Sequence, residues 1–201
     1  MKKIELLSPA GSMDKLKIAL LYGADAVYFG GRNYSLRANA KNLGIDEIKE
    51  ACVYAHSLGK KVYVTVNIVF HNEDTKGITN YLKELSLANV DAIIVSDMAI
   101  VDIVRDNKIN IPIHISTQAS NANIESIKFL KSEGVERVVL ARECSRDNIK
   151  EIIDGLRGAK LFLRPRRFGK TTNMLMLKEY FDITKKEENK DLFSGLYIDT
   201  L

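Results

Sequence analysis

Short apolar runs recur along the chain and alternate with segments of helical polarity. The runs are nearly continuous and rich in β-branched residues, which is typical of strands buried on both faces. They lie at Ile4–Leu7, Ala26–Phe29, Val62–Val66, Ala92–Val95, Ile113–Ser116, Val138–Ala141 and Lys160–Leu163. Between the first two runs, an amphipathic helix is indicated by the i, i+3, i+4, i+7 stripe of Leu16, Ala19, Leu20 and Gly23.

Local signals mark where these helices begin and end. N-caps are expected at Ser12, Asp46 and Ser145, and left-handed residues that end helices are expected at Gly23, Gly59 and Gly134. The step from loop to strand also repeats, in the strings Tyr22-Gly-Ala-Asp-Ala-Val-Tyr, Leu58-Gly-Lys-Lys-Val-Tyr, Ala88-Asn-Val-Asp-Ala-Ile-Ile and Glu133-Gly-Val-Glu-Arg-Val-Val. The chain is therefore built from similar strand–helix units.

Strict alternation of strands and helices predicts a parallel sheet, either open and doubly wound or closed into a barrel. The first loop, Ser8-Pro-Ala-Gly-Ser, lacks the GxGxxG pattern of dinucleotide-binding sheets, and the regular spacing favours a barrel. A full barrel has eight units and about 250 residues. We predict an α/β fold with a partial (β/α) TIM-type barrel of six to seven parallel units over residues 1–150. Residues 151–201 would form a separate strand–loop–helix tail.

The predicted carboxyl ends of the strands carry polar side chains that would converge on one mouth, where such barrels place their active sites. As candidates for catalysis we take Asn67, His71, Asp97, Gln118, Arg142 and Glu143. Ser8, Gly11, Gly30, Gly31, Ser96, Ser116 and Thr117 share these strand ends, and Arg37 follows in a loop. The pair Arg142 and Glu143 is the best candidate for contact with a substrate or an anion.

Each polar candidate also has a structural alternative. Asp97 and Ser116 equally suit caps of the helices that follow them, and His71 suits an exposed loop. His56 precedes a helix end and His114 alternates within a strand, so structural roles are expected for both. No Ser/His/Asp or Cys/His arrangement can be assigned from spacing.

Composition narrows the class of protein. The apolar content of 46% and charged content of 28% are ordinary for a globular protein, and no apolar run approaches the ~20 residues of a membrane span. Glu5 and Pro9 interrupt any apolar leader, so we expect no secretion signal and no membrane role. The two cysteines, Cys52 and Cys144, lack CxxC spacing, which indicates a reducing cytoplasm and no metal site. Residues 160–190 hold nine basic and four acidic residues, so the positive excess behind the net charge of +4 lies in this segment.

Seven segments resemble the N-terminal half of peptidase family U-32, the collagenase-like peptidases. They are residues 5–12, 22–31, 35–38, 61–67, 94–97, 115–119 and 138–143, and the resemblance spans residues 3–150. It implies either a protease or a relative that hydroxylates RNA bases or quinone precursors with an iron–sulfur cluster. The family's cysteine-bearing segment, His-Gly-Ala-Xaa-Cys, does not follow Leu163, and neither cysteine of this chain matches its positions. We therefore do not expect the cluster here.

The tail contains a phosphate-loop-like segment, Arg164-Pro-Arg-Arg-Phe-Gly-Lys-Thr-Thr, followed by an apolar helix over 173–181. It resembles the AAA-ATPase-like domain that accompanies PD-(D/E)XK nucleases, although Arg164 stands in place of the first glycine. The resemblance implies that ATP and magnesium would be held by the side chains and backbone of Arg166, Arg167, Gly169, Lys170 and Thr171. The alternative is a structural strand–turn–helix that supplies the seventh barrel unit.

We expect a U-32-type protein, truncated or chimeric, joined to an ATPase-like stub between residues 148 and 160. The substrate class stays open among a peptide, an RNA base and a small molecule. A nucleotide-binding module and a non-catalytic remnant are the alternatives. An incomplete barrel would expose backbone and apolar surface at its edge, so we also expect self-association there.

Overall fold

The structure, a computed structural model, describes residues 5–36, 42–156 and 160–162. The strands are β1 (Leu7–Pro9), β2 (Ala26–Gly30), β3 (Lys61–Val66), β4 (Ala92–Val95), β5 (Ile113–Ile115), β6 (Arg137–Val139) and β7 (Lys160–Phe162). The helices are α1 (Met13–Leu21), α2 (Ile45–Ser57), α3 (Thr75–Leu87), α4 (Met98–Asp106), α5 (Ile124–Ser132) and α6 (Arg146–Gly155), with a 3-10 helix, η1 (Thr117–Ala119). The predicted segments at 164–171 and 173–181 lie outside the described residues.

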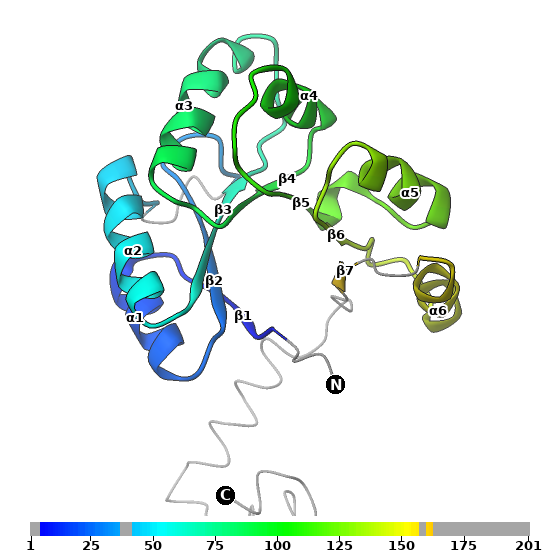
Figure 1. The fold of residues 1–201 in the computed structure, drawn as a ribbon, viewed down its shortest axis with the longest axis horizontal. Coiled ribbons are helices and arrows are strands. Elements are labelled where there is room, and N and C mark those ends of the chain that lie inside the picture. The colour runs from blue at the N-terminus through cyan, green and yellow to red at the C-terminus, as the bar shows by residue number, and fades with distance from the viewer. Residues whose placement is uncertain (1–4, 37–41, 157–159, 163–201) are drawn as a thin grey trace, which may run out of the picture. The chain divides into compact units, whose positions relative to one another are not determined.

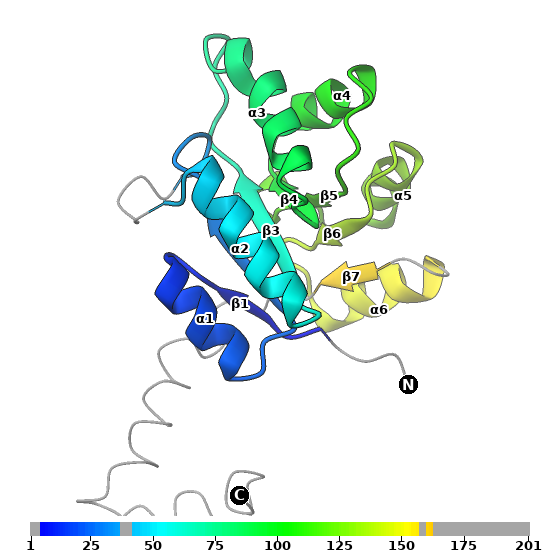
Figure 2. The same cartoon turned by 60° about the vertical axis from the view of Figure 1, so that its left-hand side comes forward.

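The strands form one parallel sheet in the order β1-β2-β3-β4-β5-β6-β7. Each strand pairs with the next along the chain; Tyr28, for example, is in register with Tyr63. Figures 1 and 2 show that the sheet curls and that the helices cover its outer face. This is the partial (β/α) barrel expected from the alternating pattern.

Side chains of alternating strand positions enter two different layers. Val62, Val64 and Val66 belong to the large core between the sheet and the helices. Tyr63 lies on the opposite face with Ala26 and Ala92, in a small inner cluster. Because successive side chains of a strand point to opposite faces, Thr65 and Asn67 continue the inner side of β3 toward its carboxyl end.

Several predicted boundaries are confirmed and others are corrected. Ser12 and Ser145 cap α1 and α6, and Gly23, Gly59 and Gly134 have φ of 94°, 66° and 83°. The prediction of Asp46 as an N-cap is wrong. Glu47 reaches back to the Gly44 backbone N–H at 2.7 Å, so α2 is capped at Gly44 and Asp46 lies in its first turn. The first strand is Leu7–Pro9, which places Ser8 inside it.

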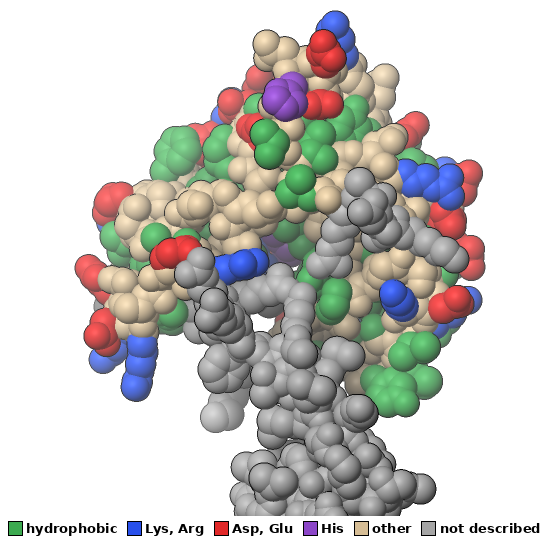
Figure 3. All heavy atoms as spheres, turned by 180° about the vertical axis from the view of Figure 1, so that it is seen from behind, with side chains coloured by type: hydrophobic (Ala, Val, Ile, Leu, Met, Phe, Trp, Pro, Cys, Tyr) green, Lys and Arg blue, Asp and Glu red, His purple; other side chains and the backbone are tan. Residues whose placement is uncertain are grey.

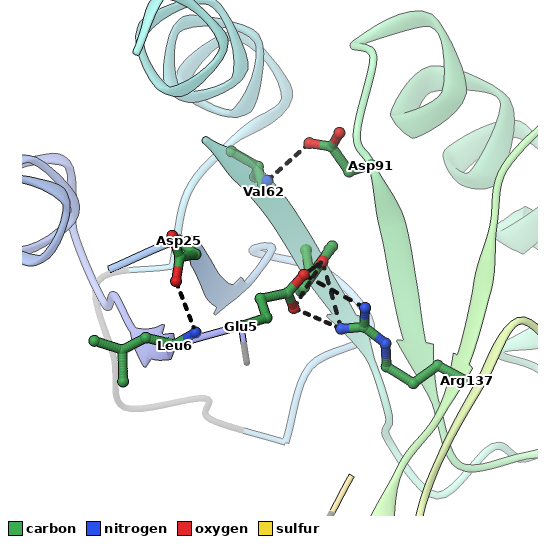
Figure 4. Close-up of polar contacts among 7 residues, drawn as sticks. Glu5, Leu6, Asp25, Val62, Asp91 and Arg137 are labelled. Atoms are coloured by element: carbon green, nitrogen blue, oxygen red, sulfur yellow. Dashed lines mark hydrogen bonds and ion pairs between the residues drawn. The ribbon is translucent and has the colours of Figure 1, made fainter. Parts of the chain in front are cut away.

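The repeated loop-to-strand strings form the same clamp twice at the amino end of the sheet. Asp25 donates its N–H to the Leu6 carbonyl at 2.9 Å, while its carboxylate accepts the Leu6 N–H at 3.1 Å. Asp91 makes the equivalent pair with Val62, at 3.0 and 2.8 Å (Figure 4). Each aspartate thus satisfies a backbone donor of the neighbouring strand and sets the register of the pair.

Candidate functional site

The predicted mouth forms at the carboxyl ends of the strands, and the structure brings two of its candidates together. Asn67 follows β3 and Gln118 lies in η1, after β5. The Asn67 Nδ2 atom donates a hydrogen bond to Gln118 Oε1 at 2.7 Å. Because β4 lies between β3 and β5 in the sheet, this bond joins two loops across the end of the intervening strand.

Asn67 also contacts the loop that follows β2. Its backbone N–H donates to the Tyr34 carbonyl at 2.9 Å, and its side-chain Oδ1 accepts the Leu36 N–H at 3.5 Å. One asparagine therefore connects the loops after β2, β3 and β5. Its amide is oriented because its oxygen faces a donor and its nitrogen faces an acceptor.

The loop after β2 is packed closely onto its own strand and onto β3. The Ser35 hydroxyl lies 3.2 Å from Thr65 Oγ1, which donates to the Phe29 carbonyl at 3.3 Å. A Cβ atom at Gly30 would collide with the Ser35 side chain, so glycine is needed there for this close approach. The fold thus presents a row of neutral hydroxyl and amide groups at the mouth.

An aromatic cluster supports the same loop. The Tyr34 ring stacks on Phe70 with centroids 5.8 Å apart and meets Tyr81 of α3 at 5.2 Å. Tyr34 has a φ of 60°, an uncommon conformation for a bulky residue. A Cβ atom at Gly31 would collide with the Tyr81 hydroxyl. The aromatic packing therefore fixes the backbone that reaches Asn67.

Asp97, His71, Arg142 and Glu143 lie in other loops and caps of the described chain. Asp97 Oδ1 accepts the Ala99 N–H at 2.9 Å and caps α4. His71 is exposed in the loop before α3, and Arg142 and Glu143 are exposed after β6. Ser116 caps η1 by accepting the Gln118 N–H at 3.3 Å. The capping interpretation of Asp97 and Ser116 agrees with this geometry, and catalytic roles for the six candidates stay predictions.

The other two histidines have structural positions, as expected. His114 is buried on β5 and meets the Tyr63 ring edge-on at 4.8 Å. His56 Nε2 lies 2.8 Å from Asp91 Oδ2, beside the clamp on Val62. His114 precedes Ser116 along β5, and His56 lies near the end of α2, beside the amino end of β3.

An ion pair on the inner side of the sheet was not predicted from the sequence. Arg137 donates to Glu5 at 2.6 Å, and the Tyr63 hydroxyl donates to both carboxylate oxygens at 3.0 Å (Figure 4). Burial alone would raise the pKa of Glu5, but the hydrogen bond and charge of Arg137, with the Tyr63 bond, lower it overall. A charged residue at the start of a buried strand, Arg137, was the available signal.

Neither cysteine is poised as a thiolate. Burial and the nearby Asp91 raise the pKa of the Cys52 thiol to about 12. Burial and Glu143 also raise the pKa of Cys144. Both thiols therefore stay protonated at neutral pH. Within residues 5–36, 42–156 and 160–162, no group of three His, Cys, Asp or Glu side chains is placed to hold a metal ion.

Figure 3 shows acidic and basic side chains interspersed with hydrophobic ones on the face seen from behind. In the described part of the chain, no helix is long and apolar enough to cross a membrane. The candidate nucleotide-binding residues Arg166, Arg167, Gly169, Lys170 and Thr171 lie outside the described residues.

Comparison with protein families decides the ancestry of the barrel. The sequence model of Peptidase family U32 matches residues 11–161, about three quarters of the chain. The chain belongs to peptidase family U32. A second family, described as Predicted AAA-ATPase, matches residues 147–201.

Curated relatives of this U32 chain include proteins named for RNA modification. Over 151 residues it is 51% identical to tRNA hydroxylation protein P1 of Bacillus subtilis, covering 75% of this chain and 36% of that protein. It is 46% identical to tRNA hydroxylation protein P of Haemophilus influenzae, covering 75% and 33%. The chain thus spans about a third of the length of the curated relatives it matches.

Relatives named as proteases are also similar to the U32 chain. It is 34% identical to a collagenase of Porphyromonas gingivalis, covering 74% of this chain and 35% of that protein. The solved structure of the U32 peptidase Mk0906 superposes with a TM-score of 0.65, at 13% identity over 80% of this chain and 68% of that one. At this identity, the structural likeness supports the fold alone.

The residues of this U32 chain do not fit the iron–sulfur cluster implied by the family resemblance. Such clusters are generally held by four cysteine thiolates, and the sequence contains two cysteines. Cys52 is buried on α2 and Cys144 follows β6, and both are free thiols. We derive no chemical step through a cluster.

Proposed function

We propose that the U32 segment of this chain serves tRNA hydroxylation and contributes the substrate-facing mouth of that activity. The observation that carries the proposal is the 51% identity to tRNA hydroxylation protein P1, against 34% to the collagenase. A role on tRNA agrees with the cytoplasmic location expected from the sequence.

The chemistry of the mouth supports recognition of RNA bases more than hydrolysis of peptides. Unpaired RNA bases are recognised by hydrogen bonds to their edges, and neutral amide and hydroxyl groups provide both donors and acceptors. The mouth presents such groups on Ser35, Thr65, Asn67, Ser116 and Gln118. A peptidase nucleophile needs an activating base or a lowered pKa, whereas both cysteines have raised pKa values.

Two assays on the purified full chain separate these functions. Fluorescence anisotropy measures binding to unmodified tRNA, and release of peptides from gelatin measures proteolysis. We expect saturable tRNA binding and no gelatin cleavage above that of a chain carrying Asn67→Ala and Gln118→Ala. Gelatin cleavage that the double variant loses, without tRNA binding, would support the peptidase instead.

A second candidate function is nucleotide binding by residues 164–171. The match of the AAA-ATPase family to residues 147–201 favours it. A lysine in a phosphate-binding loop contacts the β and γ phosphates, so Lys170→Ala should abolish binding of a fluorescent ATP analogue. Binding that is unchanged in Lys170→Ala, or absent in the unaltered chain, would remove this candidate.

A further inference from the structure

We propose that the side-chain NH₂ group of Gln118 is a specificity-determining donor that binds a carbonyl oxygen of an unpaired RNA base. Asn67 is the positioning residue that orients this donor. The inference rests on the proposed function, because it names the group through which the mouth would recognise RNA. Neither residue's role follows from the family likeness.

The carbonyl oxygen of the Gln118 side chain is already engaged. It accepts from Asn67 Nδ2 at 2.7 Å and lies 3.5 Å from the Ser116 hydroxyl, which can donate to it. A primary amide has its oxygen on one side and two N–H donors on the other. With the oxygen turned toward Asn67, the donors of Gln118 are directed away from it.

Asn67 cannot reverse its own amide without losing a bond. Its Oδ1 atom accepts the Leu36 N–H at 3.5 Å, while its backbone N–H is held by the Tyr34 carbonyl at 2.9 Å. A flip would bring an N–H donor against the Leu36 donor and an oxygen against Gln118 Oε1. The backbone of the loop after β2 therefore determines the orientation of Gln118, through Asn67.

The donor belongs to an exposed side chain that is supported by a buried one. Gln118 is exposed, whereas Ser116 beneath it is 8% exposed and buried. A pre-oriented donor loses little conformational entropy when it binds. It also discriminates, because it attracts acceptors and repels other donors.

The chemistry of a neutral donor selects a carbonyl oxygen on the ligand. Uracil carries two carbonyl oxygens and adenine carries none, so the donor predicts a preference for uridine over adenosine in single-stranded RNA. Phosphate contacts contribute equally to both oligonucleotides. The ratio of the two affinities therefore isolates recognition of the base.

The test measures binding of short oligouridylate, oligoadenylate and unmodified tRNA to the full chain by fluorescence anisotropy. We expect the unaltered chain to prefer oligouridylate, and Gln118→Met, which removes the donors without adding charge, to lower that ratio by about 3- to 10-fold. Asn67→Asp should lower it similarly. The carboxylate would accept from Gln118 and turn its amide around.

Three comparisons keep the inference open to refutation. Asn110→Asp, an exposed change in the loop before β5, adds the same charge and should leave the ratio unchanged. The double variant Asn67→Asp with Gln118→Met should be no worse than either single variant, because both remove one interaction. Circular dichroism of each variant confirms that it is folded.

The outcomes distinguish this inference from the proposed function. If the chain binds tRNA but Gln118→Met leaves the uridine-to-adenosine ratio unchanged, the inference is overturned and the proposed function stands. If the unaltered chain shows no RNA binding and cleaves gelatin, the proposed function fails and the inference fails with it. If the ratio falls in Gln118→Met but not in Asn67→Asp, Asn67 is not the positioning residue.

Discussion

Glu5 and Arg137 lie 132 positions apart in the sequence and form a partly buried ion pair with two hydrogen bonds. Arg137 Nη1 and Nη2 donate to the two carboxylate oxygens at 2.6 and 3.4 Å. The side chains are 20% and 7% exposed. The pair joins the segment before β1 to the start of β6, so it spans the curl of the sheet.

Acid should weaken this connection. The pKa of Glu5 is lowered from 4.5 in the folded chain, so its carboxylate stabilises the fold above about pH 4.5. That contribution is lost as the pH falls through the lower folded value. The unaltered chain and Glu5→Gln should therefore differ in urea midpoint at about pH 7, and this difference should shrink at about pH 3. A difference between them that persists undiminished in acid would contradict this account.

Removing the arginine should cost more than removing an exposed one. Arg137→Ala leaves a half-buried carboxylate without its charged partner, which typically costs about 3–5 kcal/mol in the free energy of unfolding. The control is Arg105→Ala, because Arg105 pairs with Asp102 and Glu133 at the surface and should matter little. Equal changes in urea midpoint for both variants would show that the Glu5 pair adds no special stability.

The contact between Gly31 and Tyr81 should behave as a steric pair. Gly31→Ala places a methyl group against the Tyr81 hydroxyl and should destabilise the chain by about 1–3 kcal/mol. Among the described residues, the Tyr81 hydroxyl is buried without a hydrogen-bond partner, so Tyr81→Phe alone should be nearly neutral. In the double variant, Tyr81→Phe should recover part of the loss. If the effects of the two substitutions on thermal unfolding simply add in the double variant, the two residues are not in contact.

Self-association at the open edge of the sheet stays a prediction, and α1 is the helix that contacts β1, the first strand at that edge. On α1 and just after it, Leu21 and Tyr22 are 81% and 84% exposed, and Ile18 is 56% exposed. We propose that this apolar surface brings copies of the chain together. Light scattering should show mass that rises with concentration, and Leu21→Lys with Tyr22→Lys should reduce it. Phe129→Lys on α5 is the control, since Phe129 is also exposed but lies away from β1. A concentration-independent monomer would contradict the proposal.

Much of the fold could be predicted because each strand–helix unit carries local sequence signals for its strand and for the end of its helix. Nearly continuous β-branched runs indicated β2 to β6 within about two residues, and positive-φ glycines marked helix ends. Asn67 and Gln118 could be placed at one mouth because parallel strands end at the same edge. Their hydrogen bond could not be foreseen, since it depends on how two loops cross the end of β4.

The features that the sequence pattern did not predict depend on contacts between distant residues or on competition between neighbouring ones. The pairing of Glu5 with Arg137 requires the curl of the whole sheet, which no local spacing encodes. Asp46 lost its expected capping role because Glu47, one residue later, reaches the Gly44 N–H. The position of Asp97 suited either catalysis or helix capping. In the structure its carboxylate accepts the Ala99 N–H and caps α4.

The most direct test of the central claim is a graft. Residues 1–162 would replace the matching segment of Bacillus subtilis tRNA hydroxylation protein P1, in a strain lacking that protein, and hydroxylated nucleosides in tRNA would be measured by mass spectrometry. We predict that the graft restores hydroxylation and that the same graft carrying Asn67→Ala and Gln118→Ala does not. A stable, folded graft that leaves tRNA unhydroxylated, or a double variant that hydroxylates as well as the unaltered graft, would contradict the account.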